Sequence, residues 1–150
     1  MNRWFFITTM LLAFSAQADE FVIEKTAKPR TIRLVNEDTA ASFFQISRAD
    51  LPPRSIGVPM QVEQLSWQTT HYPYPGINET IKVCYYPYGD LPQRPVICDT
   101  QPATPAGSSD LFKGQPFAYE SQIKIHHTVR GSRQTISPAG HDRLTLRISR

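Results

Sequence analysis

Polar and apolar residues alternate with a period of two along several short segments of this chain. In residues 117–130, for example, Ile123, Ile125 and Val129 fall on one face of an extended backbone. Alternation of this kind predicts half-buried β-strands. Further strands are expected at residues 21–23, 31–36, 42–47, 60–67, 79–86, 96–99, 133–137 and 143–149.

Turn-forming residues separate these predicted strands. The chain holds 13 prolines, so few helices of ordinary length fit between them. Residues 36–38 are expected to join 31–36 and 42–47 into a hairpin. Residues 71–76 should form an irregular aromatic loop, and residues 101–110 a mobile loop. The pattern predicts an all-β fold, an immunoglobulin-like antiparallel β-sandwich of about eight strands, with an up-and-down barrel as the alternative.

The first residues have the pattern of an export signal. Arg3 supplies a positive charge, residues 4–14 are mostly apolar, and Ala16 and Ala18 are small residues two positions apart. This arrangement is typical of a signal peptide cleaved after Ala18, and the apolar run is short for a transmembrane helix. We therefore expect residues 1–18 to be removed. Residues 19–150 then form a single domain without a transmembrane segment, in the periplasm, at the cell surface or secreted.

Two cysteines, Cys84 and Cys98, lie in the predicted mature chain. In an exported protein an even pair predicts a disulfide. The enclosed segment contains three prolines and a Gly-Asp turn signal, as expected for a loop between two strands. Closing a loop of about 15 residues stabilises a fold by roughly 3 kcal/mol in the chain-entropy model.

Charge is distributed unevenly along the chain. Residues 19–110 contain 8 basic and 11 acidic residues, whereas residues 111–150 contain 7 basic and 2 acidic residues. The whole chain has a formal net charge of +3, which does not suggest nucleic-acid binding. The asymmetry could guide self-association or contact with an acidic surface, or simply form a solvated basic face.

Two segments resemble bacterial chaperone–usher fimbrial proteins, whose folds are immunoglobulin-like. Residues 21–46 resemble the opening strands of the periplasmic chaperones, and residues 136–148 resemble the final turn and strand of pilin-type subunits. The resemblance covers about a third of the chain. It implies a minor fimbrial subunit or an accessory factor. In a subunit, residues 19–25 would be an extension that adds a strand to a neighbour.

Common catalytic and metal-binding signatures are absent from the sequence. It lacks G-x-S-x-G, H-E-x-x-H, the phosphate-binding loop and C-x-x-C, so no catalytic residue, metal ligand or cofactor is predicted. His126 and His127 should point to opposite faces of one strand, with His127 as a hydrogen-bonded core residue. As an alternative, His126, His141 and Asp142 could form a surface metal site or an acid–base pair. The protein would then be a hydrolase with an unrecognised active site.

Aromatic residues concentrate in the middle of the chain, in segments stiffened by proline or by the predicted disulfide. Rigid aromatic side chains suit recognition of a protein or glycan, or they pack over the end of the sandwich. The candidate binding-loop residues are Trp67, Tyr72, Tyr74, Tyr86 and Tyr88. We expect a non-enzymatic binding or assembly protein that associates with a protein partner or with itself. The alternative is a secreted effector or inhibitor that binds a protein or glycan through the tyrosine loops.

Overall fold

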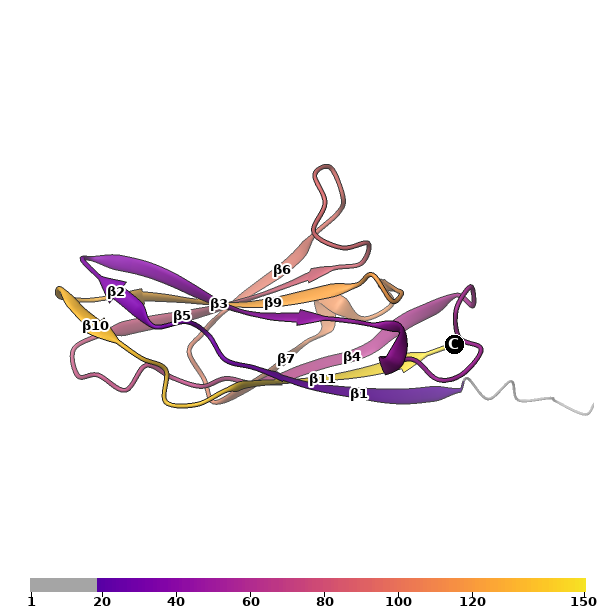
Figure 1. Ribbon diagram of the computed structural model, residues 1–150, viewed down its shortest axis with the longest axis horizontal. Coiled ribbons are helices and arrows are strands. Elements are labelled where there is room, and N and C mark those ends of the chain that lie inside the picture. Colours follow the sequence, from indigo (N-terminus) through magenta and orange to yellow (C-terminus); the bar gives the residue numbers. More distant parts are fainter. Residues whose placement is uncertain (1–18) are drawn as a thin grey trace, which may run out of the picture.

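Two antiparallel β-sheets pack face to face in the computed structural model, which describes residues 19–150 (Figure 1). The predicted signal peptide, residues 1–18, lies outside the described residues. The first sheet contains, in spatial order, β1 (Glu20–Ala27), β11 (Asp142–Ser149), β4 (Met60–Gln68) and β7 (Ala106–Ser109), and β8 (Pro116–Phe117) also pairs with β4. The second sheet contains β3 (Glu37–Gln45), β9 (Gln122–Arg130), β5 (Asn78–Tyr86) and β6 (Ile97–Pro102).

Shorter elements join the two sheets. β2 (Ile32–Leu34) pairs with β10 (Gln134–Ile136) in a separate two-stranded sheet at one end of the molecule (Figure 1). Two single turns of 3₁₀ helix, η1 (Arg48–Asp50) and η2 (Asp110–Phe112), are the helical elements among the described residues. The first of them coincides with the loop that follows β3.

The strands pair like the two arms of one long hairpin. From the chain ends inward, β1 pairs with β11, β2 with β10, β3 with β9, β4 with β7, and β5 with β6. The hairpin apex is the loop at residues 87–96, and the ends meet where the Arg150 amide donates to the Asp19 carbonyl oxygen at 3.2 Å. Rolling such a double strand into two sheets produces a jelly roll.

The predicted antiparallel β-sandwich is confirmed. Eight of the eleven described strands have four or more residues, which agrees with the expected number. Their order is that of a jelly roll rather than the immunoglobulin order, in which consecutive strands pair more often. The period-two pattern identifies the strands and their buried faces. It does not identify which strands pair, because paired strands such as β1 and β11 lie at opposite ends of the chain segment that forms the domain.

Two local predictions were wrong for this reason. The segments at 31–36 and 42–47 do not form a hairpin, because β2 pairs with β10 and β3 with β9. Residues 101–110 are not a continuous loop, because β6 extends through Pro102 and β7 follows at residues 106–109. β6 pairs with β5, and β7 pairs with β4, and these ladders satisfy the backbone hydrogen-bonding groups of the segment. The Pro-, Gly- and Ser-rich composition gave no sign of this pairing.

The main core lies between the sheets and comes from the inward positions of the alternating strands. Its aromatic centre is Phe112, whose ring makes edge-on contacts with Trp67 at 6.4 Å and Tyr85 at 6.3 Å between ring centroids. Each fully buried aliphatic or aromatic side chain stabilises such a core by about 1.5–3 kcal/mol. Gly107 is required beside it, since a Cβ there would come within 2.7 Å of Trp67 Nε1.

The segment proposed as an extension, residues 19–25, belongs to this sandwich. Its residues from Glu20 onward lie in β1, and every residue of β1 is in register with β11 of the same chain (Figure 1). Ile23 is buried in the main core. The first strand is therefore an integral part of the domain in this structure.

Candidate functional site

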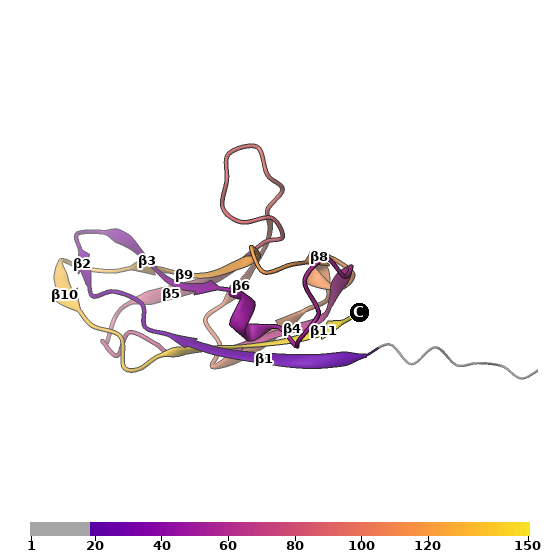
Figure 2. The same ribbon diagram turned by 45° about the vertical axis from the view of Figure 1, so that its right-hand side comes forward.

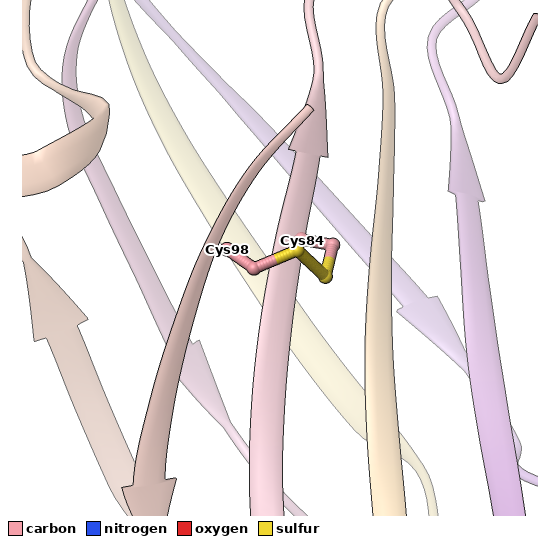
Figure 3. Close-up of a disulfide and its surroundings, with 2 residues drawn as sticks. All are labelled: Cys84 and Cys98. Atoms are coloured by element: carbon pink, nitrogen blue, oxygen red, sulfur yellow. A yellow bond between two sulfur atoms is a disulfide. The ribbon is translucent and has the colours of Figure 1, made fainter. Parts of the chain in front are cut away.

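A disulfide joins the two strands on either side of the loop at residues 87–96. Cys84 on β5 and Cys98 on β6 are directly opposite in the antiparallel register and are bonded to each other (Figure 3). This confirms the predicted bridge between two strands that flank a loop. The loop at residues 87–96 stands out from the sandwich in both views (Figures 1 and 2). The disulfide limits how far the two ends of this projecting loop can separate.

Next to the disulfide, the outer face of the second sheet carries an exposed aromatic–cationic group. Phe43 on β3 is 66% exposed and lies opposite Lys124 on β9 in the register. The Lys124 ammonium lies 5.4 Å from the Phe43 ring centroid and 4.8 Å from that of Tyr86 on β5. It also forms an ion pair with Asp90 of the projecting loop. A cation between two rings holds both rings in place at the surface.

The neighbouring cross-strand row on the same face is cationic. His126 on β9 is in register with Ala41 on β3 and Lys82 on β5. Partial burial lowers the pKa of His126, and the positive charges of Lys82, Lys124 and His127 lower it further. Burial first, and then the surrounding cations, therefore disfavour the charged form of this imidazole. We call Phe43, Lys82, Tyr86, Lys124 and His126 the aromatic–cationic face.

The projecting loop adds further apolar surface beside this face. Tyr88 is 38% exposed, and the Arg94 guanidinium lies 5.7 Å from its ring centroid. Leu91 and Val96 of the same loop are also exposed. Large exposed apolar side chains gathered on one part of a surface are typical of protein-binding sites. The loop and the sheet together thus offer a rigid surface with both apolar and cationic groups.

The five candidate binding residues divide between surface and core. Trp67 is 3% exposed and Tyr72 is 2% exposed, so both are core residues and their assignment to binding loops is wrong. Tyr72 donates its hydroxyl proton to the Arg30 carbonyl oxygen at 2.6 Å. Tyr74 and Tyr88 are exposed and Tyr86 is partly exposed; Tyr86 ends β5 just before the projecting loop, and Tyr88 belongs to that loop. Phe43 was missed although its alternation with the buried Phe44 and Ile46 places it on the outer face, because the sequence does not show that it lies beside Lys124 and stays uncovered.

Behind the aromatic–cationic face, the sandwich interior contains a charged cluster. His127 Nδ1 lies 2.7 Å from Glu79 Oε1, and His127 Nε2 lies 2.7 Å from Asp142 Oδ2. Asp142 also accepts hydrogen bonds from the Ser42 hydroxyl at 2.6 Å and the Thr70 amide at 2.8 Å. His127 and Asp142 are fully buried. The prediction that His127 is a hydrogen-bonded core residue is confirmed.

The charge state of His127 follows from these two carboxylates. Burial by itself lowers the pKa of His127, but the hydrogen bonds and negative charges of Asp142 and Glu79 outweigh it and raise the pKa to about 9. The imidazolium is therefore the form present at neutral pH. It bridges the two sheets, since Glu79 lies on β5 of the second sheet and Asp142 on β11 of the first.

This cluster does not have the geometry of a nucleophile and its base. The Ser42 hydroxyl donates to Asp142 rather than to His127, and both Ser42 and His127 are buried. The alternative site of His126, His141 and Asp142 is wrong, because Asp142 points into the core toward His127. Within residues 19–150, no group of three or more histidine, cysteine or acidic residues is arranged to hold a metal ion.

The outer face of the first sheet is different in character. It carries a shallow hollow of about 490 Å³ bordered by polar side chains of β1, β11 and β4. Its lining includes Ser66 and Thr145, which are in register, and the charged residues Glu24 and Arg143. Val22 is the one large exposed apolar residue of β1 on this side. Trp67 borders the hollow but is only 3% exposed, so this side offers no exposed aromatic ring comparable to Phe43.

No helix within residues 19–150 has the length and apolar character needed to cross a membrane. The disulfide is compatible with an exported protein, since such bonds persist outside reducing compartments.

Comparisons with known proteins bear on the fold. A scan against protein-family models found no match, and a search of the curated proteins also found none. Among solved structures, the chain is similar to the crystal structure of FlhE, with a TM-score of 0.56, 15% identity, and coverage of 87% of this chain and 97% of that chain. At this identity the similarity shows a shared fold alone.

Two virus structures also align with the chain. A chain from desmodium yellow mottle tymovirus gives a TM-score of 0.35 at 8% identity, covering 95% of this chain and 93% of that chain. A chain from the empty head of turnip yellow mosaic virus gives a TM-score of 0.38 at 12% identity, covering 99% of this chain and 89% of that chain. These scores are too low to support any argument about this protein. The comparisons thus agree with a β-sandwich and identify no family.

Proposed function

We propose that this chain is an exported, non-enzymatic binding protein that contacts a protein partner through the aromatic–cationic face and the projecting loop. The observation that carries the proposal is Phe43, which is 66% exposed on the edge strand β3 and lies beside Lys124 of β9. An exposed ring on a rigid strand loses little conformational entropy on binding. The disulfide-closed loop beside it extends the same surface.

The fimbrial resemblance suggests a narrower form of this proposal. A subunit that donates residues 19–25 to a neighbour would first have to withdraw β1 from its pairing with β11 and Ile23 from the core. An accessory factor that binds assembly components through an outer face needs no such rearrangement. We therefore favour a fimbrial or other surface-assembly accessory factor over a donor-strand subunit.

A secreted effector or inhibitor is the second candidate. The projection of the loop beyond the sandwich favours it, because such a loop can enter a concave site on a target (Figure 2). An effector of this kind would be isolated as a monomer and would form a one-to-one complex with its target. An accessory factor would instead be isolated with components of the assembly.

The test is native mass spectrometry of the protein taken from its own extracytoplasmic fraction, with co-purifying chains identified. The variant Phe43→Ser, alone and with Tyr88→Ser, is compared with wild type. Val22→Ser is the matched control, because Val22 is an exposed apolar residue on the opposite sheet. We expect Phe43→Ser to remove the partner and Val22→Ser to retain it. A partner that is retained equally by all variants would refute the proposed face, and a bare monomer from wild type would refute the accessory factor in favour of the effector.

A further inference from the structure

We infer that the partner presents an acidic, amphipathic segment, whose carboxylates meet Lys82 and His126 while its apolar side chains cover Phe43. This inference rests on the proposed function, since it assigns the partner chemistry of the same face.

The apolar and cationic groups occupy adjacent rows of the sheet. Phe43 and Lys124 share one row, while His126 and Lys82 share the next. Side chains on one face of a strand repeat every second residue, so the two rows are about 7 Å apart along the strands. A segment in which acidic and apolar side chains alternate at comparable spacing can contact both rows at once. A segment that binds this face must therefore present both acidic and apolar side chains.

Ion pairs leave this face with a positive excess. Arg130 is paired with Glu37, and Lys124 is paired with Asp90. Among residues 19–150, Lys82 has no carboxylate within ion-pair distance, although it lies on the central strand β5 of the outer face. Complementarity of charge therefore favours an acidic partner over a basic one. On the outer face of the first sheet, Glu20 and Glu24 of β1 accompany Arg143 and Arg147 of β11, so this side lacks the excess.

The surroundings of His126 point the same way. Its neighbours on the packed elements are Ala41 on β3, Lys82 on β5, and Lys124 and Thr128 two positions away on β9, with the imidazolium of His127 behind it. No carboxylate stands opposite it in these rows of the described sheet. A docked carboxylate would supply the missing negative charge and favour the protonated imidazole. Binding would then take up a proton and strengthen as the pH falls.

The experiment titrates the isotope-labelled domain, residues 19–150, with a capped twelve-residue peptide in which glutamate alternates with leucine and serine. A matched peptide carries glutamine in place of every glutamate. NMR signals locate the contact, and the His126 ring signals report its ionisation with and without peptide. We expect shifts at Phe43, Lys82 and His126, a raised His126 pKa in the complex, and no binding of the glutamine peptide at the same concentration.

Two substitutions define the result. Lys82→Ser should weaken the affinity by about threefold to fivefold, the upper part of the range for loss of an exposed ion pair, whereas Lys113→Ser on the opposite side should leave it unchanged. Equal binding of both peptides, an unchanged affinity in Lys82→Ser, or contact with the first sheet would overturn the inference. Should the natural partner depend on Phe43 but not on Lys82, the proposed function stands and the acidic-segment inference fails. Should it depend on neither, the proposed function itself fails.

Discussion

The two faces of β9 carry adjacent histidines in opposite electrostatic environments. His127 faces the core between two carboxylates, which raise its pKa to about 9. His126 faces outward among cations, and its pKa is lowered. One position along a strand therefore separates a structural imidazolium from a neutral imidazole. The side of the strand on which each histidine lies, rather than its residue type, therefore decides its role.

The difference extends to the groups around each histidine. On the inner face, every charge has a hydrogen-bonded partner, which is the condition under which buried ions are tolerated. On the outer face, Lys82 has no ion-pair partner in the described domain and Phe43 is exposed, so groups remain available for a ligand. Stability should thus depend on the inner face and binding on the outer face.

Replacing His127 should have the largest effect. His127→Ala leaves Glu79 and Asp142 buried without the cation that they bind, and loss of one partner from such a buried cluster destabilises a fold by about 3–5 kcal/mol. Urea unfolding followed by tryptophan fluorescence measures this change. His126→Ala is the matched control on the same strand. A loss below about 1 kcal/mol for His127→Ala would show that the cluster does not hold the sheets together.

Alkaline pH should weaken the wild-type fold through the same residue. The pKa of His127 is about 9 in the folded state against a reference value of 6.5, so folding favours its protonated form. The resulting stabilisation is fully present below pH 6.5 and is lost as the pH rises through 9; its size is of the order of 3 kcal/mol.

Urea midpoints between pH 6 and pH 10 measure this dependence. His127→Gln provides the comparison, because it lacks the titrating group and should give a flatter profile over the same range. Parallel profiles of the two proteins would contradict the assignment of the alkaline loss to His127.

Opening the disulfide should have the next largest effect. Replacing both Cys84 and Cys98 by serine increases the conformational entropy of the unfolded chain. We expect the free energy of unfolding to fall by about 2–3 kcal/mol. Alkylation of unreduced protein followed by mass spectrometry should also show no labelled cysteine in material from the extracytoplasmic fraction. Labelling of both cysteines would contradict export into an oxidising compartment.

Substitutions on the outer face should have the smallest effect on stability. His126→Ala and Phe43→Ser remove side chains that contribute little to the core, so each should change the free energy of unfolding by about 0.5 kcal/mol or less. The same two variants should alter partner binding. A large loss of stability in either would make the outer face part of the structural framework and remove the basis for treating it as a binding surface.

Much of the local structure could be predicted from the sequence. Alternation located β1, β4, β5, β9 and β11 to within a few residues, because each has one buried and one solvated face. It also placed His127 inward beside Ile125 and Val129, and the two cysteines predicted the staple. These features depend on residues close together in the chain.

The tertiary structure decided which of these residues meet. Glu79 and Asp142 lie 48 and 15 positions from His127, and only the jelly-roll pairing brings them to its two ring nitrogens. The same pairing buries Trp67 and Tyr72 and leaves Phe43 exposed beside Lys124. A period of two tells each side chain which face it occupies, but not which strand will lie beside it or what will cover that face. Those choices arise from contacts between distant segments, which the pattern along the chain does not encode.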